Sequence, residues 1–228
     1  MKKKTLSRKE KIARNLLLAL CFGFVVWASQ GGPMPTAELT FRQMERTRFL
    51  ARSEILCTWE TPLSVGELGT SSARTVLVGR YTDQIAVGCL FQPNNPFGNR
   101  LTLWPREEGI TPVPLSALLQ GEDGTLFHVL LFLEVPEEAA GAQATITGRI
   151  ENAKEPVETI QGERWADGVW AFWFPIDSAL TTDGDLEYGT KDLEGLPYTL
   201  ELYRTDGGPL AGQEGTLPEN FQSGVIYD

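Results

Sequence analysis

From residue 55 onward the chain is a series of short apolar runs separated by clusters of Gly, Pro, Asn and Asp. The clearest runs are residues 73–81, 84–92, 100–104, 125–135, 143–150, 168–175 and 198–205. Turn-forming sequences lie between them at 93–99, 121–124, 182–185 and 205–208. Short β-prone runs divided by such turns are typical of strands. Many short strands with few helical segments predict a mainly β fold, built as a sandwich or barrel.

The β-rich region divides softly at residues 136–142, which are rich in Glu and Ala. We therefore expect a β-rich subdomain over 53–134 and a β-sandwich-like subdomain over 143–228. Within the second, the order of strands, acidic loop and terminal strand resembles the later strands of immunoglobulin-like sandwiches. The resemblance implies an immunoglobulin-like or related β-sandwich and carries no function. One short helix is predicted at 114–120, in the sequence PLSALLQ.

The N-terminus combines a basic flank with an apolar run. Residues 1–14 hold seven basic residues and one acid, and residues 16–29 hold no charge. This pattern predicts a basic cytoplasmic tail over 1–14 and a transmembrane anchor over 15–32, with the remaining chain outside the cytoplasm. Fourteen helical residues span roughly 21 Å, whereas a bilayer core needs roughly 30 Å. A cleaved signal peptide therefore stays open as the alternative to an uncleaved single-pass anchor in the cell membrane.

Residues 36–52 predict a short juxtamembrane helix. Thr36 stands at an N-cap position, and Phe41, Met44 and Leu50 form an irregular apolar stripe between arginines. The arginines can contact lipid headgroups or form the solvated face of a helix packed on the domain. The second interpretation is favoured.

Charge is distributed unevenly along the chain. The whole sequence has 20 basic and 30 acidic residues. Removing residues 1–52, with 11 basic and three acidic residues, leaves nine basic and 27 acidic residues, a net charge of −18. Such a body repels phosphate backbones, so nucleic acid is excluded as a partner.

Few residues offer metal, redox or nucleophilic chemistry. His128 is the single histidine, and on a strand it falls among apolar neighbours, which predicts a core residue. Cys57 and Cys89 are the only cysteines beyond the apolar run, and either a disulfide or two buried thiols fits their surroundings. No cofactor is predicted.

An acidic loop follows the aromatic strand. Asp183, Asp185 and Glu187 alternate in it, and alternating carboxylates can direct their oxygens at a hard cation such as Ca²⁺. The spacing differs from that of a helix–loop–helix calcium site, and a solvated turn is the favoured interpretation.

The aromatic run at 168–175 is the sharpest feature of the β-rich region. On a strand, Trp170, Phe172 and Phe174 share one face, while Trp173 lies on the other. Such a strand is either central and covered on both faces, or one face is a binding platform. Trp165, Trp170 and Trp173 are therefore the candidate ligand-binding residues.

These features together predict a membrane-anchored, extracytoplasmic, non-catalytic β protein that binds or scaffolds a partner in the cell envelope. The partner is a protein or a glycan, in addition to the membrane itself. A carbohydrate-binding module using the aromatic strand is the alternative. A hydrolase using carboxylates alone is a third and less favoured hypothesis.

Overall fold

The computed structural model describes residues 7–29, 36–64, 68, 72–91, 99–147, 158–175, 193 and 195–218. It is mainly β, with antiparallel sheets and few helices, as the alternation of short runs predicts. All seven of the clearest apolar runs contain a strand.

The N-terminal helix α1 (Arg8–Ser29) covers the segment predicted as the membrane anchor. Its first two turns contain Arg8, Lys9, Glu10, Lys11 and Arg14, so charged residues occupy part of its length. Among the helices described here, none is both long and apolar enough to span a bilayer. A helix is therefore present over most of residues 15–32, but it does not meet the length and hydrophobicity of the transmembrane helix that we expected there.

The second helix, α2 (Ala37–Thr47), confirms the helix predicted over 36–52 and ends earlier than expected. The Thr36 side chain accepts a hydrogen bond from the Leu39 backbone N–H at 3.2 Å, which satisfies a free donor of the first turn. The helix stops because Phe49 adopts a left-handed conformation with φ 57°.

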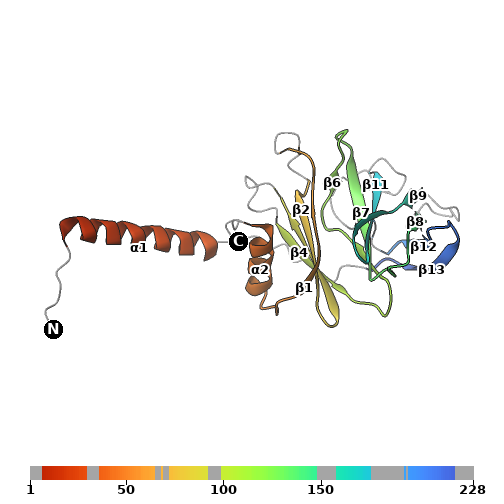
Figure 1. Ribbon diagram of the computed structural model, residues 1–228, viewed down its shortest axis with the longest axis horizontal. Coiled ribbons are helices and arrows are strands. Elements are labelled where there is room, and N and C mark those ends of the chain that lie inside the picture. Colours follow the sequence, from red (N-terminus) through yellow and green to blue (C-terminus); the bar gives the residue numbers. More distant parts are fainter. Residues whose placement is uncertain are drawn as a thin grey trace.

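Three antiparallel sheets follow (Figure 1). The first sheet is a simple meander in the order β1-β2-β3-β4. The central sheet has the order β10-β11-β7-β5, with β6 paired to β7, and the third sheet has the order β13-β12-β8-β9. The strands of the first sheet are β1 (Glu54–Glu60), β2 (Thr75–Arg80), β3 (Gln84–Leu90) and β4 (Arg100–Pro105). Those of the central sheet are β5 (Thr111–Pro114), β6 (Leu119–Gln120), β7 (Leu126–Leu133), β10 (Glu163–Ala166) and β11 (Val169–Pro175). Those of the third sheet are β8 (Gly141–Ile146), β9 (Glu158–Gln161), β12 (Pro197–Tyr203) and β13 (Pro209–Thr216).

The sheets stack in layers with the central sheet covered on both faces. One core joins the first sheet to the central sheet, and Trp104 packs there with Leu131 and Ala171. The other joins the central sheet to the third, and Phe172 packs there with Leu200. Because neighbouring residues of a strand point to opposite faces, β7 and β11 must be apolar at almost every position. This explains why their sequences show no polar face.

The outer face of the first sheet is covered by α2. Phe41 is fully buried there against Leu77, Ala86 and Leu101. A Cβ atom at Gly88 would lie 2.5 Å from the Phe41 ring, so glycine at this strand position allows the close approach of the helix.

The helix predicted over 114–120 is wrong. This segment instead contributes the end of β5 and all of β6. Leu115, Leu118 and Leu119 are all buried, and the Leu115 N–H donates to the Val129 carbonyl of β7. A helix this short cannot bury all three side chains and pair with β7, whereas an extended chain does both.

The central sheet contains strands that precede residues 136–142 in the chain and strands that follow them. Strands β5, β6 and β7 come before these residues, and β10 and β11 come after them. The sequence segments 53–134 and 143–228 therefore share one sheet.

Candidate functional site

The three candidate tryptophans lie on two faces of the central sheet. Trp173 of β11 and Trp165 of β10 pack beside the core shared with the first sheet, and both are half-buried. Trp170 points to the opposite face, where it is 5% exposed in the core shared with the third sheet. The structure thus brings Trp165 and Trp173 together and places Trp170 apart from them.

A third tryptophan, Trp59 of β1, joins this pair. The Trp59 and Trp165 rings stack with centroids 5.0 Å apart and planes inclined by 13°. Trp173 meets Trp59 edge-on at 5.5 Å, and Phe127 meets Trp173 edge-on at 5.7 Å. We name Trp59, Phe127, Trp165 and Trp173 the aromatic seam. Edge-on and offset ring pairs of this kind are individually favourable.

Sheet edges position the aromatic seam. Strand β1 is one edge strand of the first sheet and β10 is one edge strand of the central sheet, and the two contact each other. The stacked Trp59 and Trp165 rings therefore close the gap between two sheet edges. The sequence signal for Trp59 is weak, because it consists only of its spacing: Trp59 lies two residues after Cys57, so the two side chains share a face of a strand. In the structure, this face packs against the central sheet.

A carboxylate caps the seam. Glu163 Oε2 accepts hydrogen bonds from Trp173 Nε1–H at 3.0 Å and from Trp165 Nε1–H at 3.4 Å. Glu163 is exposed, so the rim combines half-exposed indole rings with a negative charge. Apolar rings beside a hydrogen-bond acceptor suit a ligand with one apolar face and hydroxyl groups, or the apolar side chain of a protein.

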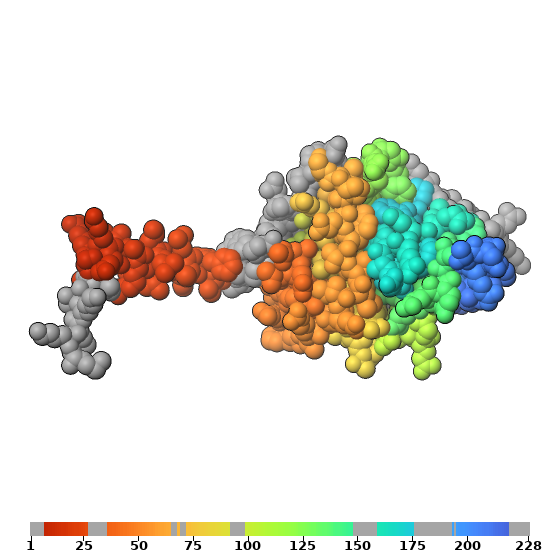
Figure 2. Space-filling model, in the orientation of Figure 1, coloured from red at the N-terminus to blue at the C-terminus, as the bar shows by residue number. Residues whose placement is uncertain are grey.

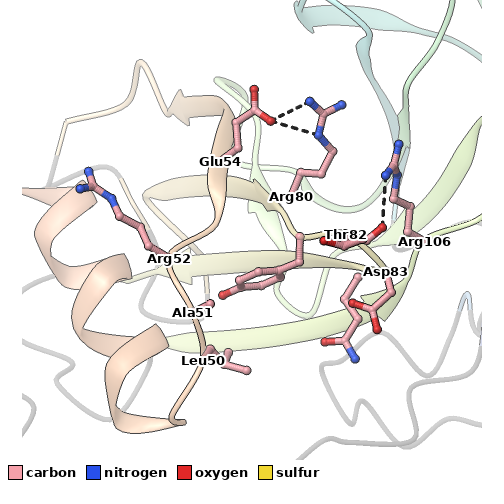
Figure 3. A pocket seen from close by; sticks show the side chains of 10 residues that line it. Leu50, Ala51, Arg52, Glu54, Arg80, Thr82, Asp83 and Arg106 are labelled. Atoms are coloured by element: carbon pink, nitrogen blue, oxygen red, sulfur yellow. Dashed lines mark hydrogen bonds and ion pairs between the residues drawn. The ribbon is translucent and has the colours of Figure 1, made fainter.

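A second concave feature is an open groove of about 880 Å³ between the α2–β1 connection and the β2–β3 turn (Figure 3). We name it the arginine groove. The residues lining it are Leu50, Ala51, Arg52, Glu54, Arg80, Tyr81, Thr82, Asp83, Gln84 and Arg106.

Two of its arginines are held by carboxylates. Arg80 contacts Glu54 at 2.7 Å and Glu134 at 3.1 Å, and Arg106 contacts Glu134 at 2.6 Å. The hydrogen bonds from Arg106, opposed in part by burial and reinforced by Arg80, lower the pKa of Glu134. Glu134 follows β7, so these bonds tie the first sheet to the central sheet. The carboxylates of Glu54 and Glu134 are thus both paired with arginine.

A buried acid lies beneath the groove. Glu45 is 2% exposed and accepts hydrogen bonds from Tyr81 Oη–H at 2.8 Å, the Ser53 N–H at 3.0 Å and Arg42 at 2.8 Å. Burial alone would raise the pKa of Glu45, but the bonds from Ser53, Arg42 and Tyr81 together outweigh it and lower the pKa. Arg42 also donates to the Ser53 carbonyl at 2.9 Å, so it connects α2 to the residue that precedes β1.

The remaining candidates are buried or lie outside the described residues. His128 is 4% exposed, which confirms the core prediction. Cys57 and Cys89 are free and buried, and burial raises the pKa of each thiol to about 11, which disfavours a nucleophilic thiolate. Asp183, Asp185 and Glu187 lie outside the described residues. Over the part of the chain that is described, no group of three His, Cys, Asp or Glu side chains could hold a metal.

Comparison with known proteins gives no relative: no family model, no curated protein and no solved structure matches this chain.

Proposed function

We propose that the protein is a non-catalytic binding or scaffolding module of the cell envelope. Its N-terminal segment attaches it to the membrane as a single-pass anchor with the basic end in the cytoplasm. The β-domain is displayed on the other side. We also propose that this domain is immunoglobulin-like, because antiparallel sheets that pack face to face around apolar cores are typical of such sandwiches.

The observation that carries the proposal is the exposed apolar surface of α1. Its large apolar side chains include Leu16 at 62%, Leu20 at 63% and Phe22 at 71% exposed. Figures 1 and 2 show α1 extending away from the β-domain. A continuous apolar surface of this kind is unfavourable in water and marks a lipid or protein contact.

The sequence around α1 favours lipid. Residues 15–37 contain no charged side chain, and seven basic residues precede them. Basic residues remain on the cytoplasmic side of an apolar segment, which orients the chain with its C-terminal domain outside.

The test is membrane fractionation of the full chain with N-terminal sequencing of the mature product. We expect it to remain in the membrane pellet after alkaline carbonate and to begin upstream of residue 15. In the double variant Leu18→Lys, Phe22→Lys, the chain should leave the pellet while the β-domain keeps its melting temperature. A wild-type chain recovered in the soluble fraction, or one starting near residue 29, contradicts the anchor.

The aromatic seam is the surface that we propose for partner binding. A glycan is the second candidate ligand, and the convergence of two indole N–H groups on Glu163 favours it, because that carboxylate can also accept sugar hydroxyls. Titration of tryptophan fluorescence with a panel of oligosaccharides tests this. Trp165→Ala should weaken binding at least about tenfold, the loss of about 1.4 kcal/mol expected from a ring contact. Trp170→Phe, on the opposite face, should bind like wild type, and equal losses in both variants would exclude the seam.

A further inference from the structure

Phe49 is the most exposed apolar side chain beyond α1. It is 97% exposed, and Leu39 is 50% exposed. Among the described residues outside α1, these two are the large apolar side chains left on the surface, and both belong to α2 or its C-terminal turn. Among the described residues, the large exposed apolar side chains thus lie on the N-terminal helix, on the helix that follows it and on that helix's C-terminal turn.

The backbone at Phe49 is held in a position that favours glycine. The Leu50 N–H donates to the Glu45 carbonyl at 2.9 Å, and the Phe49 N–H donates to the Arg46 carbonyl at 3.0 Å. This is a Schellman turn with Phe49 at the left-handed position, φ 57°. The turn directs Leu50 toward the packed face of the first sheet and leaves Phe49 outside. The left-handed conformation of Phe49 opposes folding stability, and its exposed ring gains nothing from burial to offset this cost. Backbone strain of this kind is typical of functional positions.

The charge next to Phe49 is positive in an otherwise acidic domain. Arg46 is exposed, and the Arg52 side chain is 76% exposed and pairs at 3.4 Å with Glu38, which is itself 53% exposed. Residues 37–52 carry four arginines and two glutamates, whereas residues 53–228 have a net charge of −18. Guanidinium groups beside an exposed aromatic ring match an anionic lipid surface, where arginine binds phosphate and the ring enters the interface.

The chain connection keeps this surface near α1. Six residues lie between Ser29 and Thr36, so these two residues are at most about 25 Å apart when the connection is fully extended. Figure 1 shows α2 on the side of the β-domain that faces α1, with the three sheets beyond it. If α1 is in the membrane, α2 is the layer of the domain closest to the bilayer.

We propose that Phe49, Leu39, Arg46 and Arg52 form a membrane-docking surface that binds anionic phospholipid. This surface holds the β-domain in one orientation, with the first sheet toward the membrane and the third sheet away from it. The inference rests on the proposed membrane attachment and goes beyond it, because a tether alone would leave the domain free to turn.

A fluorescent label at position 49 tests the docking. The full-length double variant Cys21→Ser, Phe49→Cys leaves the buried Cys57 and Cys89 unlabelled and takes one polarity-sensitive dye at residue 49. The matched control carries the dye at Glu214→Cys, an exposed position on β13 in the third sheet. Both are reconstituted into vesicles of phosphatidylcholine alone and into vesicles with equal parts phosphatidylglycerol, and vesicle flotation is measured in parallel.

We expect the dye at 49 to shift to the blue and to become accessible to a lipid-borne quencher in the anionic vesicles. The dye at 214 should remain water-exposed in both. Adding Arg46→Glu and Arg52→Glu should remove most of the shift at 49 while the chain still floats with the vesicles.

Three results would overturn the docking surface. A water-like dye at 49 in chains that float would leave the anchor intact and refute the docking. A shift that depends on protein concentration in detergent, without lipid, would assign the surface to a second copy of the chain. Failure of the wild-type chain to float would refute the membrane attachment together with the docking.

Discussion

At the scale of single residues, Glu134 links two sheets at a backbone position that glycine would favour. Its φ is 61°, a left-handed conformation that is unusual for a glutamate. It accepts hydrogen bonds from Arg80, at the end of β2, and from Arg106, directly after β4, while it follows a strand of the central sheet itself. The side chain is 17% exposed, so solvent screens these ion pairs only partly. We infer that the ion pairs offset the backbone strain.

Glu134→Gln should lower the free energy of unfolding by about 2 kcal/mol at neutral pH, because two charge-assisted contacts lose their charge. The folded-state pKa of Glu134 is lowered, so its contribution is complete above the ordinary carboxyl pKa of 4.5 and is lost as pH falls through the folded value. Urea unfolding of wild type and variant should therefore converge as pH decreases below about 4.5. Glu54→Gln is the control: Glu54 also binds Arg80 but is 64% exposed, and its loss should cost less than about 1 kcal/mol. If the free energies of unfolding of wild type and Glu134→Gln still differ by the same amount at about pH 3, the stabilising role of the Glu134 carboxylate is contradicted.

Substitution of Phe49, in contrast, should stabilise the folded protein. Phe49→Gly should raise the free energy of unfolding by about 0.5–1 kcal/mol in lipid-free detergent, since glycine adopts φ 57° without steric cost. Thermal melts measure the change. Gly207→Ala, at φ 78° with open space around it, is the matched control and should be destabilising. A stabilised variant that also docks poorly on anionic vesicles would show that Phe49 is kept at the expense of stability.

At the scale of elements, α2 packs on the first sheet because two strand glycines leave room for it. A Cβ at Gly79 would meet Ser53, and one at Gly88 would meet Phe41 and Met44. Phe41 is fully buried, so its ring cannot move aside. These contacts fix the helix that carries the docking surface to the sheet beneath it.

Gly88→Ala should therefore destabilise the domain by about 1–3 kcal/mol through overpacking against Phe41. The change is measured as the shift of the urea midpoint. Gly212→Ala, whose Cβ would lie 3.5 Å from the Leu200 carbonyl oxygen, should stay within about 0.5 kcal/mol of wild type. Equal effects at both positions would mean that the α2 contact is not tightly packed.

At the scale of the whole molecule, the cores on both faces of the central sheet hold the fold together without covalent links. Cys57 lies on β1 and Cys89 on β3, two strands separated by β2, and both are free. The sequence left open whether Cys57 and Cys89 form a disulfide, and in the structure they do not.

The three cysteines should consequently differ in reactivity. In the folded chain in detergent at neutral pH, an alkylating reagent small and apolar enough to enter the micelle should modify Cys21, which no part of the β-domain covers, and spare Cys57 and Cys89, because burial raises the pKa of both to about 11. Intact-mass measurement should show one adduct before unfolding and three after it. Reductant should leave the melting temperature unchanged. Two further adducts in the native protein would contradict the burial of these thiols.

The sequence by itself determined the strands and the alternation of their faces. The run at 168–175 is apolar throughout, and period-2 geometry alone separates Trp170 from Trp173. Thr36 as an N-cap is likewise visible, because capping involves only residues three apart. Such features depend on neighbours in sequence, so they can be predicted without knowing the tertiary fold.

Only the tertiary structure decided what each face meets. The stacking of Trp59 on Trp165 joins residues far apart in sequence, as does the bonding of Glu134 to Arg80 and Arg106. The predicted helix over 114–120 failed for the same reason: its backbone pairs with β7, and long-range pairing overrides local helix preference. Hydrophobic periodicity predicts which residues are buried. The residues that they pack against depend on the order of the sheets and on contacts between sheet edges, which join segments far apart in sequence.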